Sequence, residues 1–203
     1  MQRTSSIIET NSIKKMTDEL LMYREFVRIL SEKSDDRIFL NKGADHALIV
    51  LERIFKQSND TVRIFAGNLC LTVGNKPEYI LALSDFIERR GRVRILLNNY
   101  DEKLAMDSNL YMRLAYYKSE GKDIIVKKTN AKPYQESDPE RKEVHFTVGD
   151  NKAYRIETDT NQRAAQCSMN RPDTAEMAAK FFDGLFNSGE STEIDILSMF
   201  GYK

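Results

Sequence analysis

Residues 143–159 read EVHFTVGDNKAYRIETD, and this stretch decides the centre of the predicted fold. Apolar and polar side chains alternate on both sides of Gly149, Asp150 and Asn151, three residues whose composition is typical of a tight turn. Two alternating runs joined by such a turn predict an antiparallel β-hairpin.

The alternation assigns the side chains of this hairpin to two faces. One face of the first strand is apolar and should pack in the core: Val144, Phe146 and Val148. His145 and Thr147 share the opposite face. If the register is simple, Arg155 and Glu157 of the second strand lie on the same face as His145. The two faces therefore predict a core side and a polar side.

Helices and strands alternate along the chain before the hairpin. Strands are predicted at 61–67, 92–99 and 123–128, and helices at 45–58, about 75–90 and 108–120. A further strand at 164–169 and a helix at about 174–187 follow the hairpin. Strands separated by helices of this length indicate parallel neighbours joined by right-handed crossovers. We therefore predict an α/β fold, with a layered, mostly parallel sheet flanked by helices.

The first part of the chain lies outside this rhythm. Leu20, Tyr23, Val27 and Leu30 recur at helical spacing and predict an amphipathic helix from Met16 to about Ser34. We therefore divide the chain into residues 1–41, a polar segment with the amphipathic helix, and residues 42–203, the α/β domain.

Composition excludes several classes of function. The 31 Lys and Arg balance the 31 Asp and Glu, so no net field draws the protein to polyanions. No stretch approaches the length needed to span a membrane, and we expect a cytoplasmic protein. Cys70 and Cys167 lack the spacing of a zinc site or a disulfide framework. We expect no metal and no cofactor.

Two motifs together resemble the phospholipase D-like superfamily, whose signature is H-x-K-x-x-x-x-D, followed by G-S-x-N on a neighbouring strand. The first is the stretch beginning at His145, and the second is CSMN at 167–170. The chain is similar to a small, bacterial, single-motif member, but its motif is degenerate. Thr147 occupies the lysine position and Lys152 the aspartate position, while Asp150 comes two residues early.

The resemblance implies roles for particular residues. His145 would attack phosphorus and carry the phosphoryl group, and Asn170 and Ser168 would match the G-S-x-N positions at the phosphoryl oxygens. Asp150 would orient the histidine. The candidates for binding phosphate are Thr147, Arg155 and Lys152, with Arg155 replacing the missing lysine charge.

The missing lysine favours a catalytically degenerate binding or regulatory module over an enzyme. Single-motif members of the superfamily build one catalytic centre from two chains, so the resemblance also implies a homodimer. A partner protein or a nucleic acid, in a bacterial defence, stress or DNA-processing system, would suit such a module. The alternatives are a phosphodiesterase or nuclease with His145 as nucleophile, and a structural subunit of a larger assembly.

Two other features have open interpretations. His46 could act as a second acid or could be a packing or capping residue at the start of its helix. The basic cluster of Arg89, Arg90, Arg92 and Arg94 could bind phosphate, or its first two members could complement the negative C-terminus of a helix.

Overall fold

The computed structural model describes residues 2–134 and 140–202, with side chains from Thr17 onward. Its helices are α1 (Gln2–Glu32), α2 (Ala44–Gln57), α3 (Pro77–Glu88), α4 (Glu102–Met106), α5 (Asn109–Ser119), α6 (Pro172–Phe186) and α7 (Ile196–Met199). Its strands are β1 (Phe39–Asn41), β2 (Thr61–Ala66), β3 (Arg92–Leu97), β4 (Ile124–Thr129), β5 (Phe146–Gly149), β6 (Ala153–Asp159), β7 (Ala164–Ser168) and β8 (Ser191–Glu193).

The described strands form one mixed sheet of eight, in the order β1-β7-β6-β5-β2-β3-β4-β8. Only the pairs β2–β3 and β3–β4 are parallel, and the other five pairs are antiparallel. The prediction of an α/β fold is confirmed, but the prediction of a mostly parallel sheet is wrong. Helical crossovers join β2, β3 and β4, and these strands run parallel. Tight turns join β5, β6 and β7, and because a tight turn reverses the direction of the chain, these strands run antiparallel.

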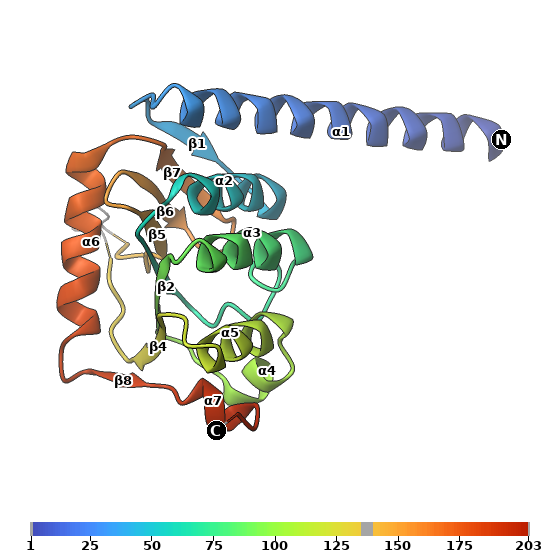
Figure 1. The fold of residues 1–203 in the computed structure, drawn as a ribbon. Helices are drawn as coiled ribbons and strands as arrows, with labels where there is room; N and C mark the ends of the chain where they lie inside the picture. The colour runs from blue at the N-terminus through green and yellow to red at the C-terminus, as the bar shows by residue number, and fades with distance from the viewer. Residues whose placement is uncertain (1, 135–139, 203) are drawn as a thin grey trace.

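Helices cover both faces of the sheet (Figure 1). On one face, α2, α3 and α5 pack on the apolar side chains of the parallel strands, including Val62, Ile64 and Ile95. On the other face, α6 places Phe182 and Phe186 against the hairpin. Val144, Phe146 and Val148 belong to this second cluster, which confirms the core face predicted from the alternation.

The first helix is longer than predicted, since α1 runs from Gln2 to Glu32. Val27 and Leu30 are buried, and α1 contacts α2 through its C-terminal part, while its N-terminal part extends away from the sheet (Figure 1). β1 pairs antiparallel with β7, so residues 39–41 already belong to the sheet. The division of the chain at residue 41 stays a prediction.

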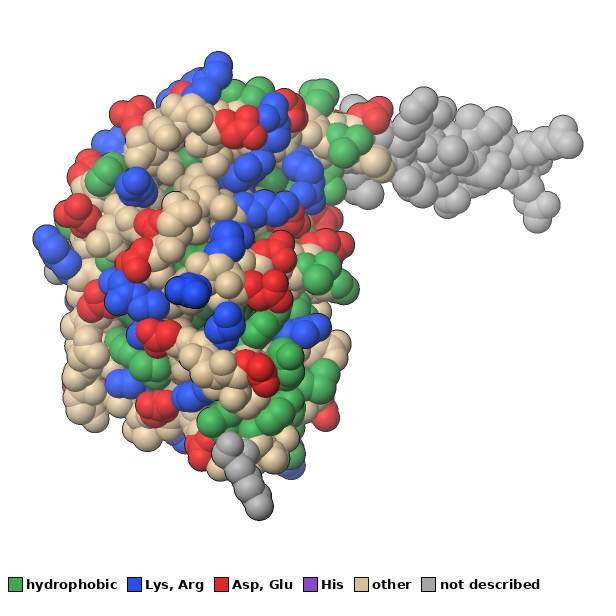
Figure 2. Space-filling view, viewed as in Figure 1, with side chains coloured by type: hydrophobic (Ala, Val, Ile, Leu, Met, Phe, Trp, Pro, Cys, Tyr) green, Lys and Arg blue, Asp and Glu red, His purple; other side chains and the backbone are tan. Residues whose placement is uncertain are grey.

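Figure 2 shows that charged side chains of both signs are interspersed over one face of the molecule. In the part of the chain that the structure describes, no helix is long and apolar enough to span a membrane. The C-terminal ends of β2 and β3 and the N-terminal end of β5 lie together at one edge of the sheet, across the strands. The candidate site lies at this edge.

Candidate functional site

A cleft of about 460 Å³ opens at this edge of the sheet. Gly67 and Asn99, which follow β2 and β3, line it together with His145, which precedes β5. In open α/β sheets, ligands bind beyond the carboxyl ends of the parallel strands, where successive connections diverge. The cleft therefore lies where the sheet geometry favours a binding site.

The register of the hairpin places the polar side chains in the cleft. Thr147 lies opposite Arg155, and the Glu157 backbone N–H donates to the His145 carbonyl at 2.8 Å. His145, Thr147, Arg155 and Glu157 all line the cleft. This confirms the predicted face of Arg155 and Glu157.

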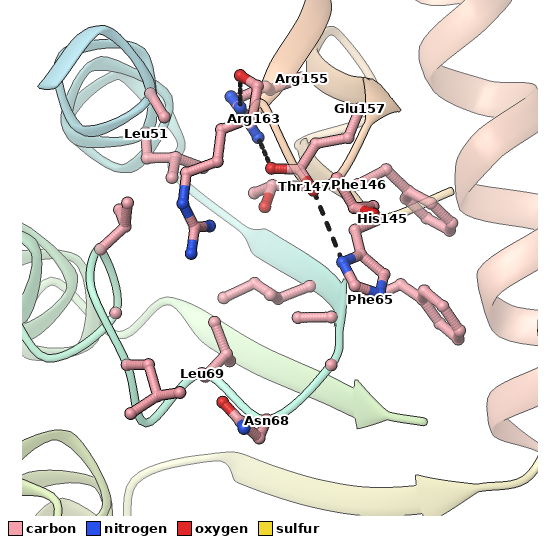
Figure 3. A pocket seen from close by; sticks show the side chains of 18 of the residues that line it. Leu51, Phe65, Asn68, Leu69, His145, Phe146, Thr147, Arg155, Glu157 and Arg163 are labelled. Carbon is pink, nitrogen blue, oxygen red and sulfur yellow. Dashed lines mark hydrogen bonds and ion pairs between the residues drawn. The ribbon is translucent and has the colours of Figure 1, made fainter. Parts of the chain in front are cut away.

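The imidazole of His145 lies between two carboxylates, Glu143 and Glu157. Figure 3 shows the Glu157 side of this arrangement. Its Nε2 is 2.6 Å from Glu143 Oε1, and its Nδ1 is 3.5 Å from Glu157 Oε2. The Asn98 Nδ2 group donates to the same Glu143 oxygen at 2.8 Å, which fixes that carboxylate. Both ring nitrogens of His145 therefore face acceptors.

This environment shifts the pKa of His145. Burial lowers the pKa, because it disfavours the charged ring, but the Glu157 and Glu143 carboxylates outweigh burial and raise the pKa above its ordinary value of 6.5. An imidazolium with both N–H groups directed at carboxylates is the form that this geometry favours.

Arg155 and Glu157 form a buried ion pair behind the histidine. Their exposed fractions are 4% and 5%, and Arg155 Nη1 donates to Glu157 Oε1 at 2.7 Å. Arg155 Nη2 donates to the Arg163 carbonyl at 3.0 Å, whereas Arg155 Nε has no partner among the described residues. Burial raises the pKa of Glu157, but His145 and Arg155 together lower it below its ordinary value. The lowered pKa favours the charged form of Glu157 beside the Arg155 guanidinium, and both side chains are buried.

Asp150 lies at the other end of the hairpin. Its carboxylate accepts from the backbone N–H groups of Asn59, Asp60 and Thr61 at 2.6, 2.9 and 2.9 Å. Five residues of extended chain span about 16 Å, so Asp150 and His145 do not meet within one chain. The hydrogen bonds give Asp150 a structural task, which is to join the β5–β6 turn to the start of β2.

The other candidates also lie at that end. Asn170 and Lys152 line a second pocket of about 130 Å³, together with Asp150. The Asn170 Nδ2 group donates to the Ser34 carbonyl at 2.8 Å, and the buried Ser168 hydroxyl donates to the Asp36 carbonyl at 3.3 Å. The structure thus brings His145, Thr147 and Arg155 together and separates them from the remaining candidates.

Sequence analysis did not assign Glu143, Asn98, Arg163 or the pairing of Glu157 with His145 to the site. Glu143 carried a signal, because it lies two residues before His145 and alternation puts both on one face. Asn98 directly follows a parallel strand, which is a second usable signal. No local pattern could have placed Arg163, which reaches the cleft from the β6–β7 connection.

His46 and three arginines of the basic cluster have partners within the fold. His46 packs against Tyr23, with ring centroids 4.2 Å apart and the ring planes tilted by 37°. Arg89 donates to the carbonyls of residues 55, 56 and 58 at the end of α2, while Arg92 pairs with Asp60 and Arg94 with Asp123. Within residues 17–134 and 140–202, no group of three His, Cys, Asp or Glu side chains could hold a metal ion.

No protein-family model matches this chain, and no curated protein sequence matches it. Several solved structures are similar. NucT from Helicobacter pylori aligns with a TM-score of 0.55 at 12% identity, over 78% of this chain and 99% of that chain. Nuc, a phospholipase D family member from Salmonella typhimurium, aligns with a TM-score of 0.50 at 15% identity, over the same shares.

TrmBL2, an archaeal chromatin protein with a novel mode of DNA binding, aligns with a TM-score of 0.53 at 10% identity. The alignment covers 94% of this chain but only 66% of TrmBL2. At such identities the similarity concerns the fold, and it agrees with the resemblance found at His145. This chain has the phospholipase D-like fold over most of its length.

Proposed function

We propose that this chain is a binding or regulatory module that holds a ligand in the His145 cleft and does not cleave phosphodiester bonds. The observation that carries the proposal is the position of the imidazole between two carboxylates, 2.6 Å from Glu143 and 3.5 Å from Glu157. A histidine that attacks phosphorus must present an unprotonated nitrogen. The raised pKa of His145 favours the protonated ring instead.

The surroundings of His145 support the same proposal. Thr147 occupies the lysine position and offers only a neutral hydroxyl, and charge-assisted hydrogen bonds are about twice as strong as neutral ones. The positive charge of Arg155 is matched by Glu157 at 2.7 Å, so little of it is left to stabilise a developing phosphoryl charge. Lys152 is exposed at the far end of the hairpin.

The test is hydrolysis of bis(p-nitrophenyl) phosphate and of single-stranded DNA by the native protein, His145→Asn and His46→Asn. His46→Asn is the matched control, because it removes the other histidine, which packs against Tyr23 and does not line the cleft. We expect all three proteins to hydrolyse neither substrate above the buffer rate. Hydrolysis that disappears in His145→Asn and persists in His46→Asn would contradict the proposal.

The second candidate is a phosphodiesterase or nuclease with His145 as nucleophile. It is favoured by the position of His145 in an open cleft of a fold similar to Nuc. Asn170 and Asp150 would then have to reach the histidine from a second copy of the chain, since one chain keeps them apart. Asn170→Ala distinguishes this candidate, because it should abolish hydrolysis only if Asn170 contacts the substrate.

We further propose that the protein is a homodimer. Single-motif members of this superfamily share a site between two chains, and α1 leaves Leu21, Met22 and Phe26 exposed at 59%, 68% and 40%. Exposed apolar side chains on a long helix support assembly with another copy. Light scattering on the purified protein tests this directly, and a monomer at micromolar concentration would contradict it.

A further inference from the structure

The cleft has two chemically different walls. Its apolar wall is formed by Leu51 of α2 and by Leu69, Leu71 and Val73 of the connection after β2. Its polar wall is formed by the hairpin and by the connection after β6, and Figure 3 shows the Arg163 guanidinium reaching into the space between the two walls. A ligand that fills this cleft must meet both surfaces.

The ionisable side chains of the polar wall are paired with one another except at one position. The Arg155 guanidinium is paired with the Glu157 carboxylate at 2.7 Å, and His145 Nε2 lies 2.6 Å from Glu143 Oε1. Within the described part of the chain, Arg163 forms no ion pair, and its guanidinium donates a hydrogen bond to the Thr72 hydroxyl. The lining therefore carries one unmatched positive charge, on a side chain that is only partly buried.

Backbone conformation indicates that this arginine is held in place. Arg163 has φ +50° and Thr72 has φ +45°, both in the left-handed region that a β-branched residue such as threonine rarely adopts. Arg155 Nη2 donates a hydrogen bond to the Arg163 carbonyl at 3.0 Å, and Arg163 Nη2 donates one to the Thr72 hydroxyl on the other side of the cleft. Strained non-glycine residues persist where surrounding contacts over-determine them, and they cluster at ligand sites.

We propose that the cleft binds a small amphipathic carboxylate, with its carboxylate on the Arg163 guanidinium and its apolar body against Leu51, Leu69 and Leu71. This inference rests on the proposed binding function of the same cleft and names its ligand class. A guanidinium matches a carboxylate with two parallel N–H donors. One unmatched positive charge suits a monoanion, whereas a phosphate monoester would bring a second negative charge close to Glu157.

The test is isothermal titration calorimetry on the full chain with octanoate, octanol, butyrate and octyl phosphate as probes. We expect octanoate to bind roughly tenfold or more tightly than octanol, because a hydrogen bond to a charged group is lost in the alcohol. Butyrate should bind more weakly than octanoate, because it buries less apolar surface. Octyl phosphate should not bind more tightly than octanoate.

Two matched pairs of variants locate the probe. Arg163→Gln should weaken octanoate roughly tenfold or more and leave octanol unchanged, whereas Arg90→Gln should change neither. Arg90 is a suitable control because it is also an arginine at a left-handed position, φ +71°, but it is exposed and lies before β3, at the end of that strand away from the cleft. Leu71→Ser should weaken octanoate, while Leu81→Ser, on the outer face of α3, should not.

The inference is overturned if octanol binds as tightly as octanoate, if octyl phosphate binds more tightly than both, if Arg163→Gln keeps full affinity, or if no probe binds. Circular dichroism melting of each variant shows that it is folded before its affinity is interpreted. These outcomes are independent of the hydrolysis assay. Hydrolysis that depends on His145 would contradict the proposed function without removing an anion site at Arg163.

Discussion

The two ends of the β5–β6 hairpin hold acidic side chains in opposite circumstances. At the cleft end, Glu157 is buried, and its partners are the side chains of Arg155 and His145. At the turn end, Asp150 is partly exposed, and its partners are three backbone N–H groups. At the cleft end, the charged side chains line a cavity that a ligand could enter. At the turn end, the carboxylate of Asp150 holds two segments of the backbone together.

This difference indicates a binding role for the charged groups at the cleft end and a structural role for Asp150 at the turn end. Three hydrogen bonds from backbone N–H groups occupy most of the acceptor sites of a carboxylate and leave it little to offer a ligand. A buried pair of side chains adds little to stability, because desolvation offsets the attraction between the charges. Because the buried pair of Arg155 and Glu157 adds little stability, it is a better candidate for a binding role than Asp150. The following variants test this difference between the two ends.

The largest effect is expected at the cleft end. Arg155→Met leaves Glu157 buried without its main partner, so the free energy of unfolding should fall by about 3–5 kcal/mol. Urea denaturation measures this change. The double variant with Arg155→Met and Glu157→Leu should recover most of the loss, because it removes both buried charges. A single variant as stable as the native protein would show that Glu157 does not depend on Arg155.

A smaller effect is expected at the turn end. Asp150→Ala removes three hydrogen bonds to partly solvated N–H groups, as the loss of a helix cap does, and should lower the free energy of unfolding by about 1 kcal/mol. Asp150→Asn should lose less, because asparagine keeps an acceptor oxygen and tolerates the φ of +50° at this position. Octanoate binding should not change in either variant. A loss of binding would mean that the two ends are coupled.

The third prediction concerns pH and acts only through the cleft end. The pKa of His145 is raised in the folded protein, so its stabilising contribution is complete below about 6.5 and is lost as the pH rises through the folded value. The pKa of Glu157 is lowered, so its contribution is present above its ordinary value of 4.5 and is lost as the pH falls through the folded value. The two contributions coexist between these limits.

Proton NMR of the imidazole signals checks this prediction. The His145 signal should titrate above pH 6.5 in the native protein and at lower pH in Glu157→Gln, which removes a neighbouring negative charge. The His46→Gln variant assigns the two histidine signals. A His145 titration below 6.5 in the native protein would mean that burial outweighs the carboxylates, and it would reopen the case for His145 as a nucleophile.

Several features of the site could be predicted from the sequence because they depend on local alternation. The hairpin, its core face, and the common face of His145, Thr147 and Arg155 all follow from the two-residue repeat of a strand. The parallel or antiparallel direction of the outer strands could not be predicted so well, because it depends on which strands meet across the sheet. β1 illustrates this, since it pairs with β7 more than 120 residues later.

The positions of Asp150, Ser168 and Asn170 show where spacing alone was insufficient. Spacing in the sequence measures distance along the chain, whereas a site depends on which end of each strand a residue occupies. β7 runs antiparallel to β6, so Ser168 lies opposite Tyr154, towards the turn, and away from Glu157. Ser168 and Asn170 therefore match the G-S-x-N positions in sequence, but they lie at the turn end of the sheet. Within one chain they do not reach His145 at the cleft end.

The sequence by itself determined the helices α2, α3, α5 and α6, the strands β2 to β7, the hairpin and the polar face of His145, because each depends on side-chain periodicity within a short segment. Only the tertiary structure decided which charges meet. It brought Glu143 and Glu157 to the two sides of one imidazole, and it carried Arg163 across the cleft to Thr72. These contacts depend on register and on loop paths, which packing of the whole sheet sets and no local pattern records.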